Sequence, residues 1–226
     1  MKTLVIFDID GTLLQTADLH HRIMTKILRD DGMDPTFQPW AAYPHYTDLG
    51  VLQVLSRHYR GRDLTRAELA RYEGLYAAGL RDHLVQNLVP EVAGASALLA
   101  DLREMGVAMA FATGSLREMA KIKLSLLGLG DEVHLATGGE HLTREEIVRD
   151  AACRAVADAP FAAVILGDGI WDQKTAQNLG LPFVALETGT HVFDGSPAAT
   201  IKDFTEITAA ELAALARPVH WAEDMQ

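Results

Sequence analysis

Residues 4–12 read LVIFDIDGT, an apolar run that gives way to two carboxylates, a glycine and a threonine. In an extended strand alternate side chains point to the same face, so Asp8 and Asp10 can both project beyond the end of the strand. Two neighbouring carboxylates repel each other unless a cation or a shared proton relieves the repulsion. The pattern favours a metal site or a catalytic acid pair, although an acidic turn would also explain Asp and Gly at this place.

Short apolar runs alternate with helix-like stretches along most of the chain. The predicted strands are Thr3–Phe7, Val107–Ala112, Val133–Ala136, Ala163–Leu166 and Phe183–Leu186, with a weaker candidate at Thr200–Phe204. Continuous apolar strands separated by helices are typical of a parallel sheet covered on both faces. We therefore predict a three-layer, Rossmann-like α/β fold.

Roughly a hundred residues separate the first predicted strand from the second, far more than one crossover helix needs. The helical patterns of this insert lie at Ala17–Asp30, Leu49–Tyr59 and Arg66–Leu84, and the proline-marked stretch Met33–Thr47 is expected to be a loop. Thr65 followed by Glu68 predicts a capping box at the start of the last helix. We assign residues 15–88 to an inserted all-helical domain, and residues 1–14 and 89–226 to the α/β core.

Three of the predicted strands end in polar turns that contain glycine. The first strand leads into Asp8 and Asp10, the second into Thr113 and Gly114, and the fourth into residues 167–172, GDGIWD. In open parallel sheets, ligands bind beyond the carboxyl ends of the strands. We expect these three turns to converge on one site.

The three motifs together resemble those of the haloacid dehalogenase superfamily of phosphohydrolases. They are D-x-D-G-T at residues 8–12, Thr113 after an apolar strand, and G-D-x-x-x-D at residues 167–172. Each motif alone is weak, but all three in order, each at a strand end, are specific. The resemblance covers essentially the whole chain, because the helical insert is similar to the alpha-helical cap of that superfamily.

The resemblance implies a two-step phosphoryl transfer that depends on Mg²⁺. Asp8 would be the nucleophile that forms an aspartyl-phosphate, and Asp10 would protonate the leaving oxygen and then activate water. The metal ligands would be Asp8, the backbone carbonyl of Asp10 and Asp168. Asp172 would complete the acidic shell, either as a ligand or by orienting one.

The resemblance also assigns the phosphate-binding groups. The hydroxyl of Thr113 and the amide of Gly114 would hold the transferring phosphoryl group at the start of a helix. The alternative for Thr113 is a capping role for a helix predicted at Leu116–Leu127.

A basic residue should pair with the nucleophile, and here the chain departs from the usual pattern. Many relatives carry a Lys-Pro pair that this chain lacks, so Arg144, at the start of a predicted helix, is our candidate. The alternative for Arg144 is a charge exposed to solvent. Lys121 and Lys123 are its competitors, but Lys123 lies about 12 Å beyond Ser115 along a helix, which predicts that it is too far away.

The insert contributes further candidates. Residues 16–20 resemble the hinge of beta-phosphoglucomutases, where a histidine approaches the second aspartate, so His20 would tune the protonation of Asp10; a surface histidine is the alternative. The loop at residues 43–48 is expected to lie over the site. Trp40, His45 and Asp48 are therefore candidates for contacts with the leaving group.

Several chemistries of the superfamily differ at single residues. Dehalogenases and phosphonoacetaldehyde hydrolases depart from this chain at Asp10, which favours phosphate ester hydrolysis. A phosphoglucomutase would need a basic residue near residues 45–55, where only histidine occurs, although Arg57 keeps that alternative open. A non-catalytic metabolite- or partner-binding protein on the same fold is the other alternative. We predict a Mg²⁺-dependent phosphomonoesterase that acts on a sugar phosphate, phosphoglycolate or a nucleoside monophosphate.

Composition limits the partners and the compartment. A net charge of −11 argues against nucleic-acid binding. The single cysteine, Cys153, excludes an intrachain disulfide and favours a reducing cytosol. No targeting leader precedes the first strand, and no apolar run approaches the ~18 residues of a membrane span. We expect a cytoplasmic protein, monomeric or homodimeric, whose partner is a small phosphorylated metabolite rather than nucleic acid or a membrane.

Overall fold

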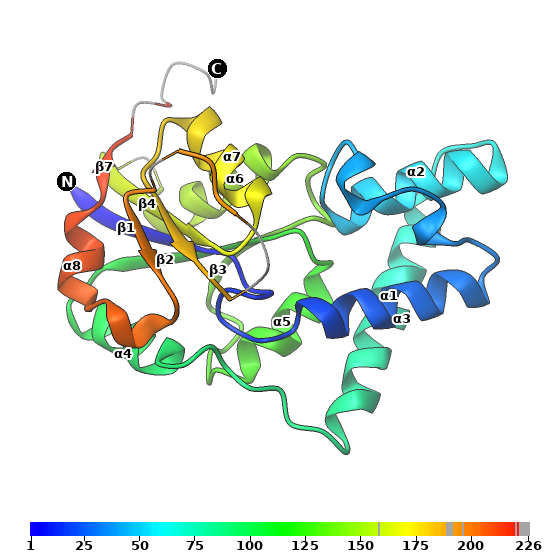
Figure 1. Ribbon diagram of the computed structural model, residues 1–226, viewed down its shortest axis with the longest axis horizontal. Coiled ribbons are helices and arrows are strands. Elements are labelled where there is room, and N and C mark those ends of the chain that lie inside the picture. The colour runs from blue at the N-terminus through cyan, green and yellow to red at the C-terminus, as the bar shows by residue number, and fades with distance from the viewer. Residues whose placement is uncertain (158, 189–191, 196, 220, 222–226) are drawn as a thin grey trace.

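The computed structural model describes residues 1–157, 159–188, 192–195, 197–219 and 221. Within these residues, helices cover both faces of a twisted sheet, and an all-helical insert stands beside the sheet (Figure 1). None of the described helices is long and apolar enough to cross a membrane.

One sheet of seven strands forms the centre of the described structure. Its strands are β1 Lys2–Phe7, β2 Ala108–Thr113, β3 His134–Thr137, β4 Phe161–Gly167, β5 Phe183–Leu186, β6 Ala199–Ile201 and β7 Arg217–Pro218. Neighbours in the order β3-β2-β1-β4-β5-β6 are parallel, and β7 pairs antiparallel with β4. Phe7 lies opposite both Phe111 and Leu166, so the chain leaves β1, β2 and β4 at the same edge of the sheet. The predicted parallel sheet is confirmed, whereas β7 was not predicted.

Two apolar layers flank the sheet. The helices of the α/β part are α4 Ala95–Glu104, α5 Arg117–Ser125, α6 Arg144–Val156, α7 Ile170–Leu179 and α8 Ala209–Ala214. Val5 and Phe7 pack with buried residues of α4, α5 and α8, while Leu4 and Ile6 pack with those of α6 and α7. Because successive side chains of β1 point to opposite faces, this strand is buried on both sides. The three-layer fold class is thereby confirmed.

The insert between β1 and β2 is helical, as its periodicity predicted. Its elements are α1 Ala17–Asp30, α2 Asp48–Arg60 and α3 Arg66–Leu84, with 3-10 turns at Pro35–Phe37 and Trp40–Ala42 inside the predicted loop. The predicted capping box is present: Thr65 accepts from the Glu68 amide, and the Glu68 carboxylate accepts from the Thr65 amide. Leu116 and Met119 of the α5 region join the apolar cluster of the insert, so α5 supports the insert from the core side.

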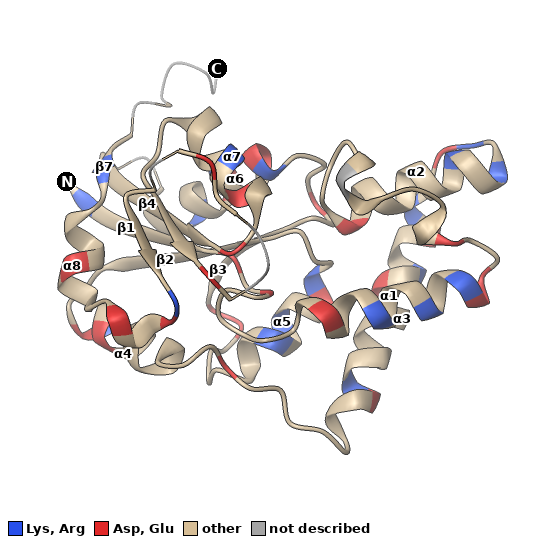
Figure 2. Cartoon of the chain, viewed as in Figure 1, with Lys and Arg blue, Asp and Glu red and all other residues tan. Residues whose placement is uncertain are grey.

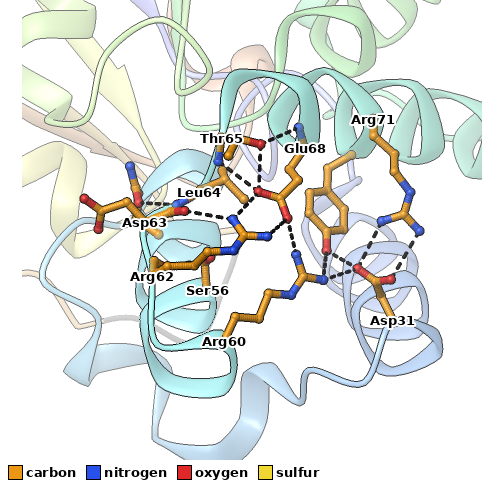
Figure 3. Close-up of polar contacts among 11 residues, drawn as sticks. Asp31, Ser56, Arg60, Arg62, Asp63, Leu64, Thr65, Glu68 and Arg71 are labelled. Atoms are coloured by element: carbon orange, nitrogen blue, oxygen red, sulfur yellow. Dashed lines mark hydrogen bonds and ion pairs between the residues drawn. The ribbon is translucent and has the colours of Figure 1, made fainter.

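A network of charges ties the far ends of the insert helices together. Figure 2 shows basic and acidic segments near one another at the ends of α1 and α2. Asp31, which caps α1, accepts hydrogen bonds from Arg60, Arg71 and Tyr72 (Figure 3). Glu68 accepts from Arg60 at 2.7 Å, so one guanidinium bridges the two carboxylates. Each acid in this network faces more than one cationic donor.

Candidate active site

The site forms where β1, β2 and β4 end, as the three motifs predicted. Asp8 follows β1 directly, and its amide donates to the Leu166 carbonyl of β4 at 3.1 Å. Gly11 turns the chain with φ of +85°, and a Cβ at this position would collide with the Asp168 carboxylate. Glycine is therefore required here both by the backbone conformation and by the close approach of β4.

Three buried carboxylates meet at this edge of the sheet. Oxygens of Asp8, Asp168 and Asp172 all lie within 4.8 Å of one another. The Thr12 hydroxyl donates to Asp168 at 3.0 Å, and the Gly169 amide donates to Asp172 at 3.1 Å, which orients both acids. The Asp10 carboxylate is not part of this group among the described residues.

The charges of these acids are poorly compensated. Burial, together with the charge of Asp172, raises the pKa of Asp8 far above its usual value, against the lowering effect of Arg144. Burial and the nearby Asp8 raise the pKa of Asp168 to about 7. Burial raises the pKa of Asp172 as well, and Arg144 only partly opposes this. A set of oxygen ligands with excess negative charge fits a hard divalent cation such as Mg²⁺.

Arg144 supplies the positive charge next to these acids. Its guanidinium lies 3.2 Å from Asp8 and 3.6 Å from Asp172, and the side chain is only 12% exposed. Its Nε donates to the Tyr46 carbonyl at 3.1 Å. Arg144 is the first residue of α6, as predicted, and the alternative of a charge exposed to solvent is wrong.

Lys123 is also at the site, contrary to the distance prediction. Its Nζ lies 2.6 Å from the nearer Asp10 oxygen, and its side chain is fully buried. The prediction was wrong because it measured distance along the helix axis only. Helical side chains lean toward the helix N-terminus, and the long lysine side chain covers the remaining distance. Lys121, in contrast, pairs with Asp131 at 3.3 Å and is partly exposed.

Asp10 is held by three groups rather than by the acid cluster. It accepts from Thr16 at 2.5 Å, from Ser115 at 2.7 Å and from Lys123. Burial favours the neutral acid, but the charge of Lys123 and these hydrogen bonds outweigh it and keep the pKa of Asp10 below its usual range. Asp10 is therefore ionised at neutral pH.

A buried hydrogen-bonded chain continues from Lys123 into the insert. The Lys123 ammonium donates to His20 Nδ1 at 3.0 Å, and His20 Nε2 lies 2.8 Å from Asp48. Because Nδ1 accepts, Nε2 carries the proton that Asp48 accepts. The Leu116 amide donates to the other Asp48 oxygen at 2.8 Å. His20 is thus buried close to Asp10, and the alternative of a surface histidine is wrong.

Thr113 and Gly114 reach the position that the motif predicted. Both line the cavity above Asp8. The Thr113 hydroxyl accepts from the Ser115 amide at 3.2 Å, but the residue that caps α5 is Leu116, so the helix-capping alternative for Thr113 is wrong. The Gly114 carbonyl accepts from the Asp48 amide at 2.8 Å, which attaches the insert to the core. Their phosphate-binding role remains a prediction.

A cavity of about 770 Å³ opens above the acids, between core and insert. Trp40 and Asp48 are among its lining residues, as expected of leaving-group contacts, whereas His45 is not among the described ones that line it. Sequence reasoning gave no role to Tyr46, although it lies in the predicted loop beside the candidates that were chosen. Trp171, which lies within the last acidic motif, stacks on Tyr46 of the insert loop.

Comparisons with known proteins show the family of this chain. The sequence model of the family described as haloacid dehalogenase-like hydrolase matches residues 5–186. A phosphoglycolate phosphatase from Rhodobacter capsulatus is 33% identical over 204 residues, which cover 84% of this chain and 86% of that protein.

Solved structures show the same fold at lower identity. A hydrolase from Pseudomonas syringae has a TM-score of 0.68 and 21% identity over 92% of this chain and all of that one. The CbbY protein from Rhodobacter sphaeroides, solved in complex with phosphate, has a TM-score of 0.67 and 18% identity over 94% of this chain and 99% of that one.

Proposed function

Because the chain belongs to the haloacid dehalogenase-like hydrolase family, and is a phosphatase of that family, we propose that it is a Mg²⁺-dependent phosphomonoesterase that uses an aspartyl-phosphate intermediate. One observation carries the proposal. Asp8 stands at the floor of the cavity, 3.2 Å from the Arg144 guanidinium and beside two further buried acids. A small phosphorylated metabolite would bind there, with residues 15–88 acting as a cap domain over a core of residues 1–14 and 89–226.

The donor set supports a resident metal ion. Asp8 and Asp168 would bind the ion through their side chains. Asp172 would either bind the ion itself or orient another ligand. Asp10 would contribute its backbone carbonyl, because its carboxylate is already bound by Lys123. When bound, Mg²⁺ would neutralise charge on both the nucleophile and the phosphate, which otherwise repel each other.

In the first step the Asp8 carboxylate attacks phosphorus, a new P–O bond forms, and the ester P–O bond breaks. Arg144, the Gly114 amide and the Thr113 hydroxyl would hold the non-bridging oxygens. The leaving oxygen takes a proton through Asp10. Because Asp10 is held ionised, this proton would come from the Lys123 ammonium, which contacts it directly.

In the second step water attacks the phosphorus of the aspartyl-phosphate and releases inorganic phosphate and the free Asp8 carboxylate. Asp10 takes the proton of this water and returns one to Lys123, which restores the starting state. The Lys123–His20–Asp48 chain would hold the relay in place while the insert covers the site.

The structure gives less support to the two alternatives. Arg57, which kept a mutase open, pairs with Asp63 at 2.6 Å on the surface and is absent from the described residues that line the cavity. A non-catalytic binding protein would have no use for an ionised Asp10 held next to Asp8.

The experiment is phosphate release from a panel of small phosphate esters, with Mg²⁺ or with EDTA. Wild type is compared with Asp8→Asn and with Asp131→Asn, an exposed acid that serves as a matched control. Release that needs Mg²⁺, survives Asp131→Asn and disappears in Asp8→Asn supports the proposal. Release that persists in Asp8→Asn, or no release from any ester, contradicts it.

A further inference from the structure

Several of the residues that line the cavity have aromatic rings. We call His21, Trp40, Tyr46 and Trp171 the aromatic wall; all four line the cavity. Tyr46 stacks on Trp171 with ring centroids 3.8 Å apart and planes 15° apart. His21 stacks on Trp40 at 4.8 Å and 16°. The Tyr46 hydroxyl lies 3.1 Å from His21 Nε2, which joins the two stacks into one surface.

The members of the wall come from different parts of the fold. His21 belongs to α1, Trp40 and Tyr46 belong to the loop between α1 and α2, and Trp171 belongs to the first turn of α7 in the core. The wall therefore exists only while the insert lies over the sheet edge. All four residues are partly exposed rather than buried, and all four line the cavity.

The same cavity offers little positive charge to a second anionic group. Among the described lining residues, Arg144 and Lys202 are the only lysine or arginine, and Arg144 is already paired with Asp8. Lys202 is exposed, and the acids Asp18 and Asp203 also line the cavity. Burial, followed by the neighbouring His20, lowers the pKa of His21, so this ring is neutral at pH 7.

We propose that the cavity selects phosphomonoesters whose leaving alcohol carries a neutral planar ring, such as a nucleoside 5′-monophosphate, over small esters with a second anionic group. This inference rests on the proposed phosphatase function and adds the substrate class. Stacking on an aromatic side chain is tolerant of ring type, because every such ring has a π face. A second carboxylate or phosphate would instead lose its hydration without gaining a partner.

The size of the cavity agrees with this class. A volume of about 770 Å³ lies within the range typical of sites for drug-sized ligands, roughly 300–1,000 Å³. Phosphoglycolate has only a two-carbon leaving group and would leave most of this space unfilled. A nucleoside offers both a neutral sugar and a planar ring to fill this space.

The first test compares esters that differ in one part. Uridine 5′-monophosphate, ribose 5-phosphate and 2-phosphoglycolate are assayed with wild type and Mg²⁺, and pyridoxine 5′-phosphate tests a ring without a sugar. We expect kcat/KM about tenfold to a hundredfold higher for a ring-bearing ester than for ribose 5-phosphate or 2-phosphoglycolate. Which ring ester is preferred distinguishes a nucleotide from a directly phosphorylated heteroaromatic alcohol.

The results separate this inference from the proposed function. Equal or better turnover of 2-phosphoglycolate overturns the inference but leaves the phosphatase intact. Binding is measured independently through quenching of tryptophan fluorescence by uridine 5′-monophosphate in Asp8→Asn. Quenching without turnover by wild type would support the ring site and overturn the hydrolase, whereas the absence of quenching overturns the ring site.

The second test changes the wall itself. Trp40→Leu should lower kcat/KM for uridine 5′-monophosphate about tenfold more than kcat/KM for ribose 5-phosphate, while Trp40→Phe, which keeps a ring, should stay near wild type for both esters. If Trp40 acted only in folding, its loss would lower kcat/KM for both esters by the same factor. Parallel loss for both esters, or no loss for the nucleotide, overturns the proposal.

Discussion

Two groups of acids in this protein have opposite environments. At the sheet edge, Asp8, Asp168 and Asp172 lie close together, with one guanidinium beside Asp8 and Asp172, and burial raises the pKa of each acid. At the far end of the insert, Asp31 contacts two arginines and a tyrosine hydroxyl, and its pKa falls to about 2 (Figure 3).

The difference shows what each group is for. The insert network lowers the free energy of the folded state, because every carboxylate in it has cationic partners. The acids at the sheet edge raise that free energy, and the proposed binding of a cation would relieve this effect. Charge that is left uncompensated in a buried cleft is typical of a functional site, since binding relieves it.

Of the variants that test this difference between the two groups of acids, Asp8→Asn should have the largest effect. Turnover should fall at least about a thousandfold, because the amide cannot act as the nucleophile. In EDTA the same variant should have a free energy of unfolding about 1–2 kcal/mol higher than wild type, because an acid with a raised pKa destabilises the fold at neutral pH. Its urea unfolding midpoint should therefore be higher. Phosphate release and urea unfolding measure the two effects. A variant that is less stable than wild type would contradict the idea of uncompensated charge.

Lys123→Met tests the one site acid that is compensated. Without the ammonium, the pKa of Asp10 rises, so the limb of the pH–turnover profile that reports its ionisation should move to higher pH. Turnover at neutral pH should fall about tenfold to a hundredfold. The control is Lys121→Met on the same helix, which should change neither the pH–turnover profile nor the turnover at neutral pH. An unmoved profile in Lys123→Met would remove Lys123 from the relay.

Addition of Mg²⁺ should relieve the repulsion at the sheet edge. At a concentration of 100 times Kd, binding to the folded state alone adds about 2.7 kcal/mol to the free energy of unfolding. Thermal unfolding with Mg²⁺ and with EDTA measures this difference. Asp168→Asn should abolish the shift and Asp31→Asn should retain it; the reverse result would place the ion elsewhere.

Asp31→Asn is expected to have the smallest effect. It should change the free energy of unfolding in the opposite direction to Asp8→Asn. It should lower the free energy of unfolding by about 1–2 kcal/mol at pH 7, after allowance for solvent screening. Hydrogen bonds from Arg71 first, and also from Tyr72 and Arg60, depress this pKa. The contribution is therefore complete above about pH 4 and disappears as the pH falls toward 2. Urea unfolding across this range checks it, and a difference that grows on acidification would refute it.

The sequence predicted those parts of the fold that local patterns determine. The bounds of α1, α3 and β5 agree with the prediction to the residue, because helical periodicity, a capping box and a short apolar run define them. The strand β7 has only two residues and pairs antiparallel with β4, so no run of apolar residues predicts it.

The site was predictable as a set of motifs but not as a network. Asp8, Asp10 and Asp168 follow strands whose ends must meet in a parallel sheet, so their convergence could be inferred. The contact between His20 and Asp48 joins residues 28 positions apart in the insert, and no local spacing encodes it. Lys123 was misplaced because side-chain length and direction were left out.

The central claim is that a phosphoryl group passes through Asp8. The direct measurement is the intact mass of wild type after acid quenching during turnover of its best ester with Mg²⁺, followed by peptide mapping. An adduct with the mass of one phosphoryl group on Asp8, absent in Asp8→Asn, is the predicted result. Steady turnover with no adduct, or with an adduct on another residue, would contradict the claim.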